Sequence, residues 1–98
     1  MGEDMSEINL HRAAGVLLGM AAGDALGSGY EFKPSIGEGA QVAMAGSRLW
    51  EPGEWTDDTD MAIAIAEAAA DGADLRDPAV LDGVARRWYE WSLQSKDV

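Results

Sequence analysis

The 98-residue chain contains no cysteine and only one histidine, His11. The absence of cysteine excludes disulfides, thiolate zinc sites and cysteine nucleophiles, and a single histidine makes a His-rich metal site or a Ser-His-Asp triad implausible. Basic residues are scarce as well: 7 Lys and Arg stand against 18 Asp and Glu, for a net charge of -11. Nucleic acids and anionic membranes attract basic surfaces, so we expect neither as a partner. The acidic balance fits a metal-binding site or simply a self-repelling, soluble surface.

Long apolar runs are also missing. The acidic N-terminus lacks the basic start and apolar core of a signal peptide. The most apolar stretch, residues 13–23, is too short and too rich in glycine to span a bilayer. We therefore expect a cytoplasmic protein with no membrane association. A hydrophobic fraction of 47% is typical of a globular fold, and the length predicts one small domain or a piece of a larger one.

Three apolar segments predict an all-α helical bundle, with helices near residues 6–26, 57–71 and 78–92. The second helix is expected to begin after Thr56 and the third after Asp77, because both residue types are favoured N-caps. In the third helix, apolar residues recur at helical spacing and predict a core-facing stripe rather than a ligand site: Leu81, Val84, Trp88 and Trp91.

The first segment is apolar around most of its circumference, which predicts a buried helix. Either Asp4 with Glu7, or Ser6 alone, is expected to cap its start. Three glycines recur every four residues within it: Gly15, Gly19 and Gly23. Each costs about 1 kcal/mol of helix stability relative to alanine. We therefore expect another backbone to approach this stripe closely.

Glycine and proline punctuate residues 27–53, which predicts a long loop. Val42 and Met44 alternate with small residues and are compatible with a very short strand. The loop holds an acid between two aromatic residues: Tyr30, Glu31 and Phe32. Because long structureless connections are usually functional or disordered, we expect a functional loop in which Glu31 meets substrate or metal.

Residues 56–60 place three carboxylates and two hydroxyls at the start of the second predicted helix. Acids there can act as caps that complement the helix dipole, each contributing about 0.3–1 kcal/mol. One or two acids would satisfy that role, whereas three repel one another, and a bound cation would offset the repulsion. Oxygen ligands favour magnesium, manganese or calcium over zinc or copper. At this point capping and metal binding both remain open. Asp24, after the glycine stripe, is interpreted as a cap for the following loop.

Two segments together resemble the ADP-ribosylglycohydrolase family, which includes the dinitrogenase reductase-activating glycohydrolases. One segment is residues 12–27, RAAGVLLGMAAGDALG, followed by Tyr-Glu-Phe at 30–32. The other is Trp-Thr-Asp-Asp-Thr at 55–59 with Met61, which matches the first metal-binding motif of the family. Tryptophans 88 and 91 and the closing residues 95–98 also resemble the next family segment. The resemblance covers nearly the whole chain, and the two motifs in this order are specific.

The resemblance implies an all-α fold with two magnesium or manganese ions at the base of a cleft for ADP-ribose. It implies metal ligands at three positions: Thr56, Asp57 and Asp58. It implies catalytic roles for Asp57, Asp58 and Glu31, the last on a loop that closes on metal or substrate. Asp24 and Gly27, with Glu31, would line the substrate cleft. Asp60 lies outside the family motif and is assigned no ligand role.

The resemblance also implies a second motif, of the Asp-x-Asp-Thr kind, which this sequence does not contain. We therefore expect residues 1–98 to form a single, incomplete domain that is inactive without a C-terminal segment or another chain. The implied function is metal-dependent removal of ADP-ribose from a modified protein or a small ADP-ribose derivative. The alternatives are a non-catalytic helical remnant that binds metal or a partner chain, and a small acidic bundle whose acids are only caps.

Overall fold

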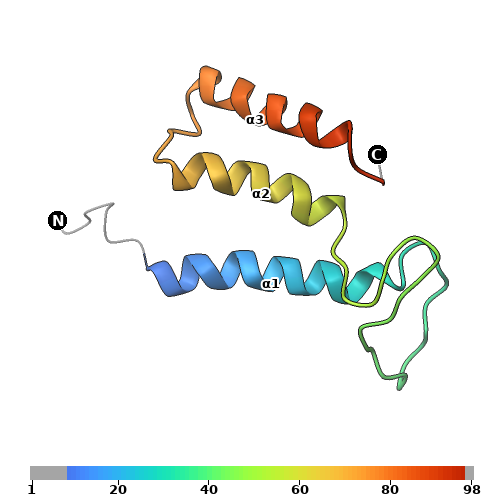
Figure 1. The fold of residues 1–98 in the computed structure, drawn as a ribbon. Helices are drawn as coiled ribbons and strands as arrows, with labels where there is room; N and C mark the ends of the chain where they lie inside the picture. Colours follow the sequence, from blue (N-terminus) through green and yellow to red (C-terminus); the bar gives the residue numbers. More distant parts are fainter. Residues whose placement is uncertain (1–8, 97–98) are drawn as a thin grey trace. The chain divides into compact units, whose positions relative to one another are not determined.

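The computed structural model describes residues 9–96, which form three α-helices and no strand. They are α1 (Leu10–Ser28), α2 (Asp57–Ala70) and α3 (Pro78–Ser92), shown in Figure 1. The all-α prediction is confirmed. None of the three helices combines the length and hydropathy that a membrane span requires.

The chain divides into two compact units, one ending at Glu54 and the other beginning at Trp55. The first unit contains α1 and the loop that follows it. The second unit contains α2 and α3.

The loop of the first unit is held together by side chains rather than by strand pairing. The Tyr30 hydroxyl accepts from the backbone N–H of Ala43 and donates to the Ala43 carbonyl, both at 3.1 Å. The short strand expected around Val42 and Met44 is therefore wrong, because the polar backbone groups between them already have a side-chain partner. The tyrosine closes the loop without a sheet.

Helix α1 begins after Asn9, whose side chain accepts a hydrogen bond from the backbone N–H of Arg12 at 3.1 Å. The caps expected at positions 4, 6 and 7 lie outside the described residues. The helix ends at Ser28, two residues beyond the predicted end. The helix starts at Leu10, later than the predicted start near residue 6. The reason is that Asn9, a favoured N-cap residue, lies directly before the apolar segment.

The expectation that α1 is a buried helix is wrong for the structure described. Leu10 is 77% exposed, and Val16 and Leu18 are each 70% exposed. A Cβ added at any of the three stripe glycines, Gly15, Gly19 and Gly23, would meet no atom within 4 Å. An apolar surface that runs around a helix is buried only if neighbours cover it on several sides, and the described residues of its own unit do not supply them.

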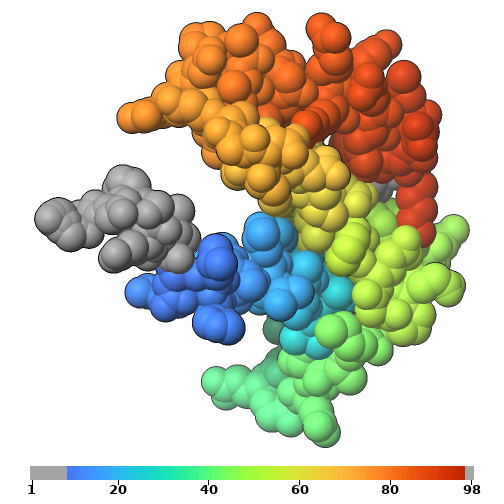
Figure 2. Space-filling view, turned by 60° about the vertical axis from the view of Figure 1, so that its left-hand side comes forward, coloured from blue at the N-terminus to red at the C-terminus, as the bar shows by residue number. Residues whose placement is uncertain are grey.

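Helices α2 and α3 form the packed part of the chain. They lie side by side in Figure 1, and their atoms make one continuous mass from yellow to red in Figure 2. Ala64 and Ala68 of α2 and Val84 of α3 are buried together, with Val80 and Trp88 packed against them. The prediction of a core-facing stripe on α3 is confirmed at Val84 and Trp88, although Leu81 is 50% exposed.

Polar groups fix the ends of this hairpin. Thr56 and Asp77 are the N-caps of α2 and α3, as predicted, and Pro78 takes the first helical position. In the connection, Asp74 accepts from the Arg76 guanidinium at 3.0 Å, and this hydrogen bond lowers the pKa of the Asp74 carboxyl. Because the pair is exposed, it contributes little to stability.

Candidate metal and substrate site

The Thr-Asp-Asp motif lies where α2 begins. The Thr56 hydroxyl oxygen accepts a hydrogen bond from the backbone N–H of Asp58 at 3.2 Å, and the Thr56 side chain is buried. Asp57 is half-buried and Asp58 is exposed in the first helical turn, while Thr59 is buried. The motif is therefore a capped helix start that carries two carboxylates beside a buried threonine.

Asp60 has a different role from its neighbours. Its Oδ1 accepts a hydrogen bond from the Trp55 indole at 2.9 Å, and its Oδ2 accepts one from the Trp91 indole at 3.1 Å. Both carboxylate oxygens thus hold tryptophans, one just before α2 and one near the end of α3. This arrangement gives a third acid at this helix start a structural role.

The other predicted site residues belong to the first unit. Asp24 is half-buried and lies inside α1, one turn before its end, rather than at the end as expected. Gly27 is exposed in the last turn. The next residue, Ser28, is buried, and its hydroxyl lies 3.1 Å from the Ala25 carbonyl and 2.8 Å from the Glu54 carbonyl. Ser28 therefore joins the end of α1 to the far end of the loop.

Glu31 is held by a tryptophan that the sequence analysis did not single out. The Trp50 indole N–H donates to Oε2 of Glu31 at 3.2 Å, and Trp50 is only 6% exposed. The indole N–H of a buried tryptophan usually has a hydrogen-bond partner. A tryptophan in a polar loop therefore indicates that a nearby acceptor, here Glu31, is held in place. The contact gives the Glu31 carboxylate a defined position.

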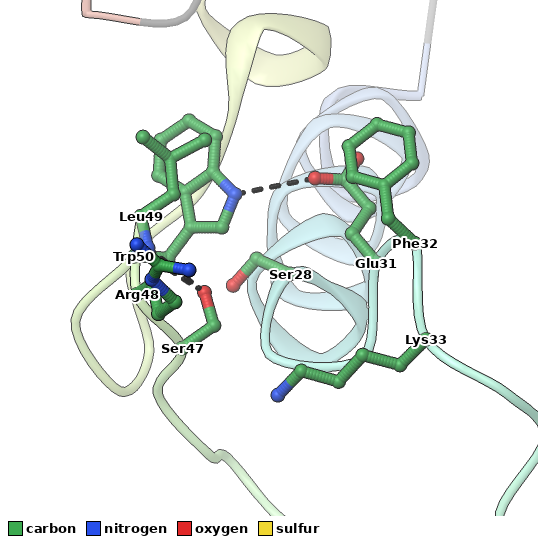
Figure 3. A pocket seen from close by; sticks show the side chains of 8 residues that line it. All are labelled: Ser28, Glu31, Phe32, Lys33, Ser47, Arg48, Leu49 and Trp50. Atoms are coloured by element: carbon green, nitrogen blue, oxygen red, sulfur yellow. Dashed lines mark hydrogen bonds between the residues drawn. The ribbon is translucent and has the colours of Figure 1, made fainter.

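A pocket of about 380 Å³ lies beside Glu31. Eight residues line it, and Figure 3 shows them: Ser28, Glu31, Phe32, Lys33, Ser47, Arg48, Leu49 and Trp50. Residues 31–33 form one wall and residues 47–50 the other. The predicted site residue Glu31 is therefore part of a concave surface, in the long loop that the sequence predicted to be functional.

The motif offers the type of ligand atom that a hard cation prefers, but too few ligands to complete its coordination. The groups of Thr56, Asp57 and Asp58 are all oxygens, as magnesium and manganese prefer. Within residues 9–96, however, no three His, Cys, Asp or Glu side chains cluster so as to hold a metal ion. The structure brings the three motif residues together in the second unit, and Asp24, Gly27 and Glu31 belong to the first.

Comparison with known proteins identifies the family. The ADP-ribosylglycohydrolase family model matches residues 5–97. The chain belongs to this family. The predicted resemblance is thereby confirmed.

Two curated members of the family are similar to this chain over most of its length. An ADP-ribosylarginine hydrolase Tri1 of Serratia proteamaculans (strain 568) is 40% identical over 91 residues, which cover 91% of the chain and 24% of that relative. An ADP-ribosylarginine hydrolase Tri1 of Pseudomonas putida (strain GB-1) is 42% identical over 82 residues, covering 82% and 22%. The chain thus spans about a quarter of their length. No solved structure matches it.

Proposed function

We propose that this chain contributes to a metal-dependent hydrolase that removes ADP-ribose from a modified acceptor, and that the acceptor is arginine. Its membership of the ADP-ribosylglycohydrolase family supports the reaction, and the printed names of the two relatives support arginine. The observation that carries the proposal is the capped start of α2, where Thr56, Asp57 and Asp58 stand together and Asp60 is engaged elsewhere.

Thr56, Asp57 and Asp58 would hold one magnesium or manganese ion. A bound ion of this kind orients the ribose hydroxyls and lowers the pKa of water. The two ions expected in the whole family site require further ligands, because a hard cation takes about six oxygens and the motif offers at most three side chains.

The remaining residues would act on the substrate. Loss of the acceptor passes through an oxocarbenium-like centre at the ribose, as in other glycoside hydrolysis. Asp57 or Asp58 would accept the proton of the attacking water. Glu31, fixed by Trp50, would bind a ribose hydroxyl, while Asp24 and Gly27 would shape the cleft. An ADP-ribosylated protein or a small ADP-ribose derivative would serve as substrate.

Release of ADP-ribose from ADP-ribosylated arginine tests the proposal. We compare the 98-residue chain with a chimera in which the chain replaces the matched quarter of the Serratia relative, each with manganese, with magnesium and with a chelator. The chimera is expected to turn over only with metal. The chain alone is expected to be inactive, because it lacks ligands for a second ion.

The matched variants are Asp57→Asn and Asp58→Asn in the chimera, with Asp82→Asn as the control on the exposed face of α3. We expect a loss of at least a thousandfold for the first two and none for the control, since positioning by the ion contributes several kcal/mol. A chimera that stays inactive would favour the non-catalytic alternative. Metal-dependent turnover by the chain alone would contradict the expectation that the chain needs further metal ligands for activity.

A further inference from the structure

The half-buried carboxylate of Asp60 holds two tryptophans that come from different parts of the second unit. Its Oδ1 accepts from the Trp55 indole N–H at 2.9 Å, and its Oδ2 accepts from the Trp91 indole N–H at 3.1 Å. Trp55 lies just before α2, and Trp91 lies near the end of α3. Figure 1 shows α3 running back along α2, so that the end of α3 lies beside the start of α2. Asp60 therefore joins the chain that enters α2, the first turns of α2 and the end of α3.

The contact between Trp55 and Asp60 encloses the Thr-Asp-Asp motif. Thr56 is the N-cap of α2, so Trp55 is the residue before the cap and Asp60 is the fourth helical residue. A contact between these two positions fixes the angle at which the chain enters a helix. In the usual form both residues are apolar, whereas here an indole N–H donates to a carboxylate, and hydrogen bonds to charged groups are stronger than neutral ones. The bond therefore closes a short loop around residues 56–59, which contain all three proposed metal ligands.

The chemistry of the two contacts requires a carboxylate at position 60. An indole nitrogen can only donate, and an ionised carboxylate accepts at both of its oxygens. An asparagine would place its own donor against one of the two indoles. A third indole provides a comparison: Trp88 donates to the backbone carbonyl of Met61 at 2.9 Å. This bond also joins α3 to α2, but it does not use the Asp60 carboxylate.

We propose that Asp60 is a positioning residue for the metal motif. By holding Trp55 and Trp91 it fixes the angle at which the chain enters α2, and that angle sets the directions of the Asp57 and Asp58 carboxylates. Magnesium demands near-octahedral ligand directions, and a metal site needs its ligand atoms held to within about 0.5 Å of the productive geometry. Asp60 acts through its neighbours and does not bind the ion. The inference rests on the proposed function and makes the metal motif depend on the end of α3.

Binding of manganese to the 98-residue chain tests this inference without any turnover. Bound manganese broadens the nuclear magnetic resonance signals of nearby amides in proportion to the bound fraction, so the slope of broadening at residues 57–58 measures even weak binding. Trp55→Phe and Trp91→Phe each remove one donor to Asp60 and keep an aromatic ring. We expect each to reduce the slope about tenfold, as is typical of groups that orient metal ligands. Trp88→Phe, the matched control, removes an indole donor between the same helices and is expected to leave the slope unchanged.

Asp60→Asn separates positioning from direct binding of the ion. If Asp60 were a ligand, Asp60→Asn would weaken manganese binding, whereas Trp55→Phe and Trp91→Phe would not, because they leave the carboxylate in place. Positioning predicts that all three variants weaken binding. Circular dichroism checks that each variant is folded at the temperature used, and the two Trp→Phe variants decide the question if Asp60→Asn is unfolded. Unchanged slopes in both of them, an equal loss in Trp88→Phe, or no broadening at residues 57–58 of the unaltered chain would each overturn the inference.

The outcomes separate this inference from the proposed function. Manganese binding that depends on Trp55 and Trp91, together with a chimera that releases no ADP-ribose, would keep the positioning role and remove the hydrolase. An active chimera whose metal dependence does not change with Trp55→Phe and Trp91→Phe would do the reverse. If both proposals hold, these variants raise the manganese concentration for half-maximal turnover of the chimera about tenfold. Saturating manganese then restores kcat, because the variants weaken the binding of the ion and leave its ligands in place.

Discussion

Helix α1 and the α2–α3 hairpin are both expected to be buried, yet they differ in what covers them. Val84 of α3 is 4% exposed, whereas Val16 of α1 is 70% exposed. Both valines lie in helices for which the sequence predicted burial. Periodicity therefore indicates that a helix has an apolar face, but not whether the residues that cover it belong to the same segment. In the hairpin α2 and α3 cover each other, whereas the described residues of the first unit contain no second helix to pack against α1.

The largest expected effect comes from Gly29, which lies against the backbone of Ala45 in the first unit. A Cβ at Gly29 would overlap the backbone carbonyl of Ala45, whereas a Cβ at Gly23 would meet open space. We expect Gly29→Ala to destabilise the loop by up to about 3 kcal/mol, because backbone must move to relieve the overlap. Amide hydrogen exchange of residues 28–50 measures this loss. Gly23→Ala is the matched control, and an equal response of the two variants would contradict the packing around Gly29.

Truncation of the two valines tests the comparison itself. Val84→Ala removes two buried methyl groups from the hairpin core, and we expect a loss of about 2 kcal/mol in the free energy of unfolding. Val16→Ala is expected to be neutral or slightly stabilising, since the side chain is exposed and alanine is the better helix former. Thermal unfolding followed by circular dichroism measures both. A loss of similar size at Val16 would show that α1 is covered after all.

The parts of the fold that could be predicted are those with local causes. Thr56 and Asp77 mark helix starts because their side chains bond amides two residues away, and such caps are visible in the sequence. The start of the first helix was misplaced, since several capping residues precede it and only Asn9 is the cap in the structure. The prediction that α1 is buried was wrong, because the sequence of a helix does not show whether other residues cover its apolar surface.

The same distinction applies to the candidate site. The Thr-Asp-Asp motif could be found because its residues are adjacent, and the family match confirms the resemblance it suggested. The Trp50–Glu31 contact joins residues 19 apart, and the Trp91–Asp60 contact joins residues 31 apart. No periodicity connects such pairs. The pocket beside Glu31 was missed for the same reason, because residues 31–33 and 47–50 line it together only when the loop is closed.

A smaller effect is expected at the acid that links α2 to α3. In Asp60→Asn one oxygen can still accept an indole N–H, but the new amide nitrogen is a donor and faces the N–H of the other indole. We expect a loss of about 1–2 kcal/mol in the free energy of unfolding. A shift of the Trp55 or Trp91 indole N–H signal should accompany it. Asp82→Asn, on the exposed face of α3, is the control, and equal stability of the two variants would remove the structural role of Asp60.

The smallest expected effect has the opposite sign and concerns the glycine stripe of α1. A Cβ at Gly19 meets no atom within 4 Å, so alanine adds no clash and removes the conformational entropy cost of glycine. We expect Gly19→Ala to stabilise α1 by about 0.5–1 kcal/mol in the 98-residue chain, measured as a gain in helicity and in exchange protection of residues 15–23. In the chimera with the Serratia relative, Gly19→Ala tests whether the rest of the longer protein covers the glycine stripe. If a neighbouring backbone covers the stripe there, the gain should turn into a loss, because the added methyl group then meets a packed surface. A gain in both proteins would show that the stripe is exposed in the longer protein too, and that the apolar character of α1 needs another explanation.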